Sequence, residues 1–260
     1  MIRALWTGAS GMNSMQFNMD VIANNLANAN TTGYKRSRAS FEDLIYQTTR
    51  LPGAQNADGT QLPTGMQVGM GSRPAAVQRI FTQGDYVTTG NQLDLAIEGK
   101  GMFKILSNGM EYYTRDGSFK TDRDGYIVTS NGDRLQPEFA IPQGTVDITV
   151  DPYGLLTASD ADGNVLGQVQ LTLYTFTNPA GLSAKGRNLF EQTEASGDPI
   201  EGNPGSDSLG TIAQGFLEQS NVDAVKEMVD MIVTQRTYEL NSKTVQTSDE
   251  MMGIAANLKR

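Results

Sequence analysis

The sequence predicts an α+β fold with three parts. Discontinuous helices at the two ends of the chain pair as a coiled coil, an extended segment follows the first helix, and the centre is an antiparallel all-β domain. Small and apolar residues recur every three to four positions near both ends, whereas apolar and polar residues alternate in the middle. The expected boundaries are 1–33 and 216–260 for the helical part, 34–80 for the connecting segment, and 81–215 for the β domain with a long return loop.

The N-terminal helix is predicted from a seam of small and apolar residues. Steps of three and four alternate over four heptads, which is the a/d spacing of a coiled coil, at Leu5, Gly8, Met12, Met15, Met19, Ile22, Leu26 and Ala29. The seam stops before Thr31-Thr32-Gly33, a sequence suited to a helix C-terminus with Gly33 in the left-handed conformation. One helix cannot bury such a seam alone, so a partner helix is required.

The C-terminal residues supply the expected partner. Ser220 and Asp223 have the spacing of a capping box, which predicts that the helix starts at Ser220. The three–four alternation slips by one residue around Arg236, which changes a supercoil locally without ending the helix. The apolar and small members of this seam are Val222, Val225, Val229, Ile232, Leu240, Thr244, Thr247, Met251, Ile254 and Leu258.

The connecting segment changes character along its length. Residues 34–46 fit either a short helix or an extended arm. Residues 48–71 are rich in glycine and proline and are predicted to form a loop. More than twenty residues is long for a connection inside a compact domain, so this stretch is expected to be functional or disordered until bound.

Residues 77–177 have the period of two that is typical of strands, as in 93–97, 146–150 and 169–173, with more deeply buried strands at 102–106 and 126–128. The intervening turns are predicted from Asn-Gly and Asp-Gly pairs, at Asn108-Gly109, Asp116-Gly117, Asp124-Gly125, Asn131-Gly132 and Asp162-Gly163. Residues 176–207 are low in apolar content and are expected to form a surface return. Residues 212–217 are expected to add a last strand or anchor.

Composition excludes several classes of function. The 260 residues contain no cysteine and no histidine, which rules out thiol nucleophiles, Cys/His zinc sites and a Ser-His-Asp triad. The net charge is −9, and residues 41–220 carry −11, offset by a positive N-terminal part, which disfavours binding to nucleic acid or to an anionic membrane. No stretch is long and apolar enough for a membrane span, and the N-terminus lacks the pattern of a cleaved secretory signal. We therefore expect no cofactor and no membrane insertion.

Two carboxylate pairs raise the possibility of glycoside hydrolysis. Asp122/Asp124 and Asp160/Asp162 lie in hairpin-turn sequences, where aspartate is favoured because it caps its own turn. The stretch 160–164 is similar to a calcium loop, but its glycine falls too early in the loop and Leu171 stands where the bidentate glutamate would be. The prediction is therefore that the chain is not an enzyme and holds no metal.

Three stretches resemble the bacterial flagellar axial proteins of the rod and hook. The first is Asn24-Asn25-Leu26-Ala27-Asn28-Ala29-Asn30-Thr31-Thr32-Gly33-Tyr34-Lys35. The second comprises Ser220-Asn221-Val222-Asp223, Glu227-Met228-Val229, Gln235-Arg236-Thr237-Tyr238-Glu239 and Asn241. The third begins the middle domain, at residues 82–84, 91–97 and 99–103. Within this family, residues 46–73 resemble a segment peculiar to distal rod subunits, with Leu51, Pro52, Gly53, Leu62, Pro63, Gly65 and Val68.

The resemblance implies a structural subunit that self-assembles into a rigid helical tube and transmits torque from motor to hook. It also implies export without a cleaved signal by the flagellar type III apparatus, and assembly in the periplasm. The implied partners are further copies of the chain, proximal rod proteins, the hook protein, the L- and P-ring proteins and the rod cap. Hook or proximal-rod placement, and a periplasmic carbohydrate-binding β module, are the alternatives.

The residues expected to assemble are those of the two terminal seams together with polar residues of the matching motifs. In the N-terminal helix, the expected assembly residues are Leu5, Met12, Met15, Met19, Ile22, Asn25, Leu26, Asn28, Ala29, Gly33 and Tyr34. In the C-terminal helix they are Val222, Val225, Val229, Ile232, Gln235, Arg236, Tyr238, Leu240, Met251, Ile254 and Leu258.

Overall fold

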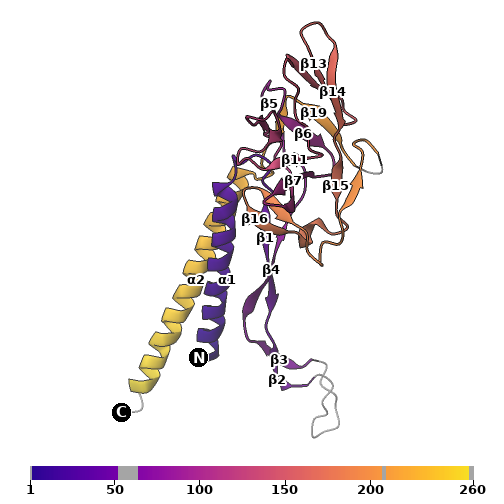
Figure 1. Ribbon diagram of the computed structural model, residues 1–260. Helices are drawn as coiled ribbons and strands as arrows, with labels where there is room; N and C mark the ends of the chain where they lie inside the picture. The colour runs from indigo at the N-terminus through magenta and orange to yellow at the C-terminus, as the bar shows by residue number, and fades with distance from the viewer. Residues whose placement is uncertain (1, 52–63, 207–208, 258–260) are drawn as a thin grey trace. The chain divides into compact units, whose positions relative to one another are not determined.

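The structure, a computed structural model, describes residues 2–51, 64–206 and 209–257 (Figure 1). The chain divides into two compact units. The helical unit comprises Met1–Leu26, Ser37–Gln78 and Asp223–Arg260, and the β unit comprises Ala27–Arg36 and Arg79–Val222. Two terminal helices flanking a β-rich middle agree with the predicted α+β class.

The helical unit contains α1 (Ile2–Ala27) and α2 (Ala224–Asn257), which lie side by side in opposite directions (Figure 1). The capping prediction was wrong by three residues. The carboxylate of Asp223 accepts the N–H groups of Val225 and Lys226 at 3.0 and 3.2 Å, so Asp223, not Ser220, caps α2. The hydroxyl of Ser220 instead accepts the N–H of Val222. In the described part of the chain, neither helix has an apolar stretch long enough to span a membrane.

Gly33 has the predicted left-handed conformation, with φ of 68°. However, α1 ends at Ala27, six residues earlier, and turns fill the interval. A Cβ at Gly33 would lie 2.7 Å from the backbone nitrogen of Asp116. Both the positive φ and this close approach require glycine.

Among its described residues, the helical unit also has two ribbons of two strands each. β1 (Ser37–Asp43) pairs with β4 (Ser72–Arg79), which selects the extended arm over the short helix. β2 (Tyr46–Arg50) pairs antiparallel with β3 (Met66–Gly69). The prediction of a loop over 48–71 was therefore wrong at its two ends, where backbone pairing overrides the turn-rich composition; residues 52–63 lie outside the described part.

All strand pairs of the β unit are antiparallel, and its largest sheet has seven strands. In spatial order these are β16 (Ser183–Gly186), β17 (Leu189–Glu191), β8 (Met110–Thr114), β7 (Phe103–Ser107), β11 (Arg134–Gln136), β10 (Ile127–Val128) and β9 (Lys120–Thr121).

Smaller sheets complete the unit. The three-stranded sheet is β12 (Asp147–Val150), β13 (Leu155–Ser159) and β14 (Val165–Gln170). The two-stranded pairs are β15 (Leu173–Thr175) with β18 (Ile200–Gly202), β19 (Thr211–Gln214) with β6 (Leu95–Glu98), and β20 (Phe216–Glu218) with β5 (Tyr86–Thr88). A short 3₁₀ turn, η1 (Pro179–Gly181), precedes β16.

The β unit has a main core and a second, aromatic cluster. Leu95, Ile97, Phe103, Ile105, Leu156 and Leu173 are among the main core residues. The second cluster comprises Met102, Tyr113, Tyr174, Phe176, Leu182 and Phe190. Residues 176–207 were expected to be a surface return, and this was wrong: they form β16, β17 and β18, and they bury Phe190 against Tyr113 and its neighbours. A few large side chains suffice for burial even where mean apolar content is low.

Two further predictions need correction. Residues 169–173 do not form one strand, because β14 ends at Gln170 and β15 begins at Leu173. Asp116-Gly117 is not a hairpin turn of the kind formed at Asn108-Gly109. Gly117 has no positive φ, and a Cβ there would lie 1.6 Å from the carbonyl oxygen of Leu95. Gly117 is glycine because two backbone segments touch.

Candidate functional site

The contact between α1 and α2 is largely polar. Moving along the pair, a Cβ on Gly11 would lie 2.8 Å from the amide nitrogen of Asn241, and the Asn18 amide donates to the Thr234 hydroxyl at 3.0 Å. At the third level the Asn25 amide donates to the Glu227 carboxylate at 3.1 Å. Each step advances seven residues on both helices in opposite directions, so the contact has a heptad period.

This heptad seam is offset from the predicted one. Gly8 and Ile22 belong to both, and a Cβ on Gly8 would lie 2.8 Å from a methyl of Val245. At every second contact along the pair, however, α1 uses Gly11, Asn18 or Asn25. Each of these residues lies one position before an apolar residue of the predicted seam. On α2 the buried residues are Glu227, Thr234 and Ser248. Asn25 was among the residues expected to assemble, on the strength of the family motif, whereas Asn18, Thr234 and Ser248 were missed because the predicted seam followed small and apolar residues.

The opposite side of α2 is apolar and exposed. At 100° per residue, eight aliphatic side chains fall within a sector of roughly 140°. They are Val225, Met228, Val229, Ile232, Val233, Leu240, Met251 and Ile254, each 46–67% exposed. A soluble helix ordinarily turns such a face inward. α2 does the reverse, and an exposed apolar surface of this length indicates an interaction site.

The predicted assembly residues fall into different environments. Ile22, Asn25, Gly33 and Tyr34 are buried, whereas Leu5, Met12, Met15, Met19, Leu26, Asn28 and Ala29 are partly buried. Val222 and Tyr238 are also partly buried. The exposed ones are Val225, Val229, Ile232, Gln235, Arg236, Leu240, Met251 and Ile254. Leu258 lies outside the described residues.

A second apolar surface lies on the ribbon of β2 and β3. Leu44, Ile45, Tyr46 and Met70 contribute to a depression of about 680 Å³, and Ile45 is 84% exposed. Of the rod-specific stretch, Leu51 and Val68 are exposed and Gly65 is half-buried, while Pro52, Gly53, Leu62 and Pro63 lie outside the described residues. An isolated two-stranded ribbon is marginally stable in water, so this surface too is suited to a partner.

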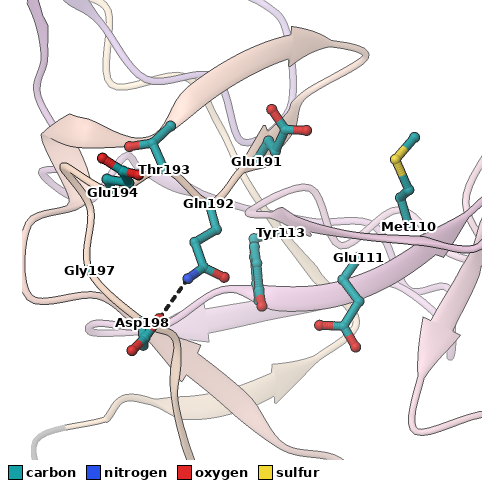
Figure 2. Close-up of a pocket in the computed structure, with 9 residues that line it drawn as sticks. All are labelled: Met110, Glu111, Tyr113, Glu191, Gln192, Thr193, Glu194, Gly197 and Asp198. Carbon is teal, nitrogen blue, oxygen red and sulfur yellow. Dashed lines mark hydrogen bonds between the residues drawn. The ribbon is translucent and has the colours of Figure 1, made fainter.

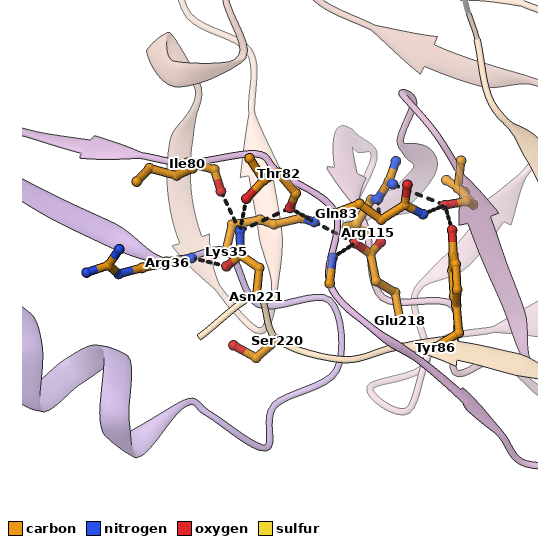
Figure 3. A network of polar contacts seen from close by, with 12 residues as sticks. Lys35, Arg36, Ile80, Thr82, Gln83, Tyr86, Arg115, Glu218, Ser220 and Asn221 are labelled. Atoms are coloured by element: carbon orange, nitrogen blue, oxygen red, sulfur yellow. Dashed lines mark hydrogen bonds and ion pairs between the residues drawn. The ribbon is translucent and has the colours of Figure 1, made fainter. Parts of the chain in front are cut away.

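In the β unit, Lys35 at the end of the N-terminal motif meets Glu218, which lies just before the C-terminal motif, in a buried ionic network (Figure 3). The ammonium of Lys35 and the Nε of Arg115 each donate to the Glu218 carboxylate at 2.6 Å. The N–H of Gly84 donates to the same carboxylate at 2.9 Å. All three charged side chains are at most 6% exposed. Lys35 and Glu218 are 183 positions apart in the sequence, so only the folded chain creates this pair.

Further hydrogen bonds tie the network to the backbone. The Arg115 guanidinium also donates to the carbonyl oxygens of Ile97, Gly99 and Gly101. Asn221 accepts the N–H of Arg36 at 2.7 Å and donates to the carbonyl oxygens of Ile80 and Thr82 (Figure 3). The chain segment after α1 and the segment before α2 are thereby fastened within one unit.

The network shifts the pKa values of both partners. Burial, the largest effect on Glu218, raises its pKa, but Arg115, Lys35 and the Gly84 N–H together bring the net pKa below its ordinary value. Burial lowers the pKa of Lys35, and the nearby Arg115 adds to this against the attraction of Glu218. The Glu218 carboxylate is shared by two cations, so its charged form is well stabilised, and the charged form of Lys35 is stabilised less.

A cavity of about 650 Å³ on the β unit gathers carboxylates and is therefore a candidate catalytic site (Figure 2). Glu111 forms an ion pair with Lys104, Glu191 pairs with Lys185 at 2.8 Å, and Asp198 accepts the Gln192 amide at 2.9 Å. Burial first, then nearby charges, raises the pKa of Tyr113 in its wall to about 12. Two of the four lining carboxylates, Glu111 and Glu191, therefore face lysines, while Glu194 also lines the cavity. The raised pKa keeps the phenol of Tyr113 protonated at neutral pH, so this phenol is not suited to act as a general base there.

The pairs Asp122/Asp124 and Asp160/Asp162 have turn geometry. Asp122 and Asp160 each accept the N–H of the following residue at 2.7 Å. Among the described residues, no group of three or more acidic side chains is placed to hold a metal ion.

Comparison with known proteins gives three family matches along the chain. Residues 5–35 match the flagella basal body rod protein family, residues 96–158 the flagellar hook protein FlgE/F/G D1 domain, and residues 213–258 the flagellar basal body rod FlgEFG protein C-terminal family. The flagellar basal-body rod protein FlgG of Borreliella burgdorferi is 51% identical, with both chains covered completely. FlgG of Agrobacterium fabrum is 48% identical over 99% of this chain and all of its own. The flagellar hook-basal body complex protein FlhP of Bacillus subtilis is 31% identical over both full lengths.

Proposed function

This chain belongs to the FlgG family of flagellar basal-body rod proteins and is a structural subunit of the distal rod, and from this premise we propose how it assembles. The observation that carries the proposal is the outward apolar side of α2. We propose that α1 and α2 pair as a coiled coil within each subunit and that the apolar side packs on neighbouring copies. Contacts of this kind, between different patches that do not close a ring, produce a helical filament.

The energy available supports this role. Eight aliphatic side chains that are 46–67% exposed would each contribute about 1 kcal/mol on burial, on the order of 8 kcal/mol per subunit. Copies of the same chain are the occupant because a rod is built from them. In the proposed tube, the seam residues named from the sequence supply contacts both within and between subunits.

We propose that the connecting segment, including the ribbon of β2 and β3 and residues 46–73, lies across neighbouring subunits and stiffens the rod. The exposed apolar side chains of the ribbon, such as Ile45 and Tyr46, support this because an adjacent subunit would cover them. Deleting residues 52–65 tests the claim. The expected filament is curved or flexible by electron microscopy, and a straight, stiff filament would show that the segment has no such role.

The acidic β unit is proposed to form the smooth outer surface of the rod, without catalytic activity. The proposed neighbours are the proximal rod proteins, the hook protein, the surrounding L- and P-ring proteins and the rod cap. The chain would reach the periplasm through the flagellar type III export apparatus and transmit torque from the motor to the hook.

Segment-resolved hydrogen exchange on the dilute full-length chain tests the assembly proposal. A two-helix pair with a polar seam should be marginal alone, so amides of α1 and α2 should exchange freely while those of β7, β8 and β11 are protected. Assembly should then protect both helices. Equal protection of the helices in the dilute chain would mean a self-contained fold and would count against assembly-coupled ordering.

A further inference from the structure

The α1–α2 contact buries the less apolar side of α2. The hydrophobic effect alone would favour the opposite arrangement, because Val229, Ile232 and Leu240 would then be covered by α1. In the structure α1 instead contacts Thr234 and Glu227. Some feature of α1 must therefore reject the apolar side of α2.

We propose that Asn18 and Asn25 of α1 are the specificity-determining residues of assembly, acting with Thr234 and Glu227 of α2. They admit only the rotation of α2 that leaves its apolar side free for a second copy of the chain. This inference rests on the proposed function, because it assigns that free side to assembly.

Rotation of α2 about its axis would cost hydrogen bonds on α1 but not on α2. If α2 turned by half a revolution, the amides of Asn18 and Asn25 would face aliphatic side chains. Asn18 would then lose its bond to Thr234, and Asn25 would lose its bond to Glu227 while keeping those to Ser37. An amide hydrogen turned toward aliphatic side chains is unfavourable, whereas the polar residues of α2 would move into water without loss. The destabilisation of the rotated arrangement therefore comes from α1. Hydrogen bonds to the polar residues of α2 stabilise the observed arrangement.

Asn25 is oriented by the backbone as well. Its amide nitrogen donates to the carbonyl of Ser37 at 2.8 Å, and its oxygen accepts the N–H of Ser37 at 2.9 Å. The remaining amide hydrogen is aimed at Glu227. Single polar residues at coiled-coil seams fix register in the same way. The seven-residue spacing from Asn25 to Asn18 repeats the selection at a second level of the helix pair.

Asn18 is the position to test, because Asn25 also holds Ser37 in place. Asn18→Leu removes the amide, and the exchange variant Asn18→Thr with Thr234→Asn restores a polar pair with the partners swapped. Introduced cysteines report the rotation, since the chain has no cysteine of its own. Gly8→Cys with Val245→Cys reports the observed pairing. Met15→Cys with Arg236→Cys reports the rotated one, because Arg236 lies among the exposed apolar residues at the level of Met15.

Disulfide formation in the full-length chain and the sedimentable assembled fraction are measured together. The chain with Asn18 and Thr234 unchanged and the exchange variant should both form the 8–245 disulfide and assemble. In Asn18→Leu the 15–236 disulfide should rise and assembly should fall, each by about tenfold.

Three results would overturn the inference. The first is that Asn18→Leu leaves disulfides and assembly unchanged. The second is that Asn18→Leu loses both disulfides, which would mean that the helix pair is simply lost. The third is that the exchange variant behaves like Asn18→Leu. Failure of the unsubstituted chain to assemble, with its 8–245 disulfide intact, would instead count against the proposed function.

Discussion

Replacing Glu218 by glutamine isolates the ionic network of the β unit. The variant keeps the shape of the side chain but removes the negative charge that Lys35 and Arg115 share at 2.6 Å. Both cations are at most 6% exposed, so water cannot compensate them. Breaking a buried pair in this way costs about 3–5 kcal/mol, a large part of the ~5–15 kcal/mol that stabilises a typical protein.

Urea unfolding of the full-length chain, followed by circular dichroism and by hydrogen exchange in the β unit, measures this loss. With a slope of about 2 kcal/mol per molar urea, the midpoint should drop by about 2 M. The pH dependence has a definite sign. Because the folded-state pKa of Glu218 is below its ordinary value of 4.5, the contribution is complete above that value and is lost as the pH falls through the lowered one. The difference in the free energy of unfolding between the unsubstituted chain and Glu218→Gln should therefore shrink in acid.

Glu111→Gln is the matched control. It makes the same substitution in the same unit and also removes the partner of a lysine, Lys104, but Glu111 is 53% exposed. Its expected loss is below about 1 kcal/mol. If Glu218→Gln lowered the urea midpoint no more than Glu111→Gln does, the reasoning about the buried network would be refuted.

Three further predictions concern titration, assembly and backbone strain. Burial, the first cause in each case, raises the pKa of Tyr86 and Tyr113 from 10.0 to about 12. The stability that these two phenols contribute is therefore intact below pH 10 and is lost as the pH rises towards 12. Ultraviolet titration should show that the chain unfolds as they ionise late, and early ionisation of the folded chain would contradict this. Ile232→Glu, on the outward side of α2, should reduce sedimentable assembly more than about tenfold with β-unit exchange unchanged, while Ile232→Val assembles; normal assembly of the glutamate variant would remove this face from the interface. Gly33→Ala should lower the free energy of unfolding by more than about 2 kcal/mol, because its Cβ would lie 2.7 Å from backbone. Gly90→Ala is the control, since Gly90 has a similar φ and open space around it, and should lose only about 1 kcal/mol in urea unfolding. Equal losses would show that the close approach is unimportant.

Local features of the sequence predicted much of the fold. The three–four spacing near both ends predicted α1 and α2, and alternation predicted strands such as β6 and β12, because helix and strand periods are properties of short segments. The pair Asn108-Gly109 predicted its turn, since both residues tolerate the positive φ they adopt. The terminal motifs likewise indicated the family, because each of them is a short stretch of neighbouring residues.

Tertiary structure alone decided which side of α2 faces α1. Periodicity marks apolar residues such as Ile232 as suited to burial, but it does not say whether the same chain or another copy covers them. The network of Lys35, Arg115 and Glu218 was equally hidden, because a lone carboxylate in a strand acquires its meaning only when folding brings distant cations to it. Pairing between segments far apart in the chain depends on contacts that no short window of sequence contains, and at the α1–α2 seam the hydrogen bonds of buried polar groups outweighed the apolar pattern.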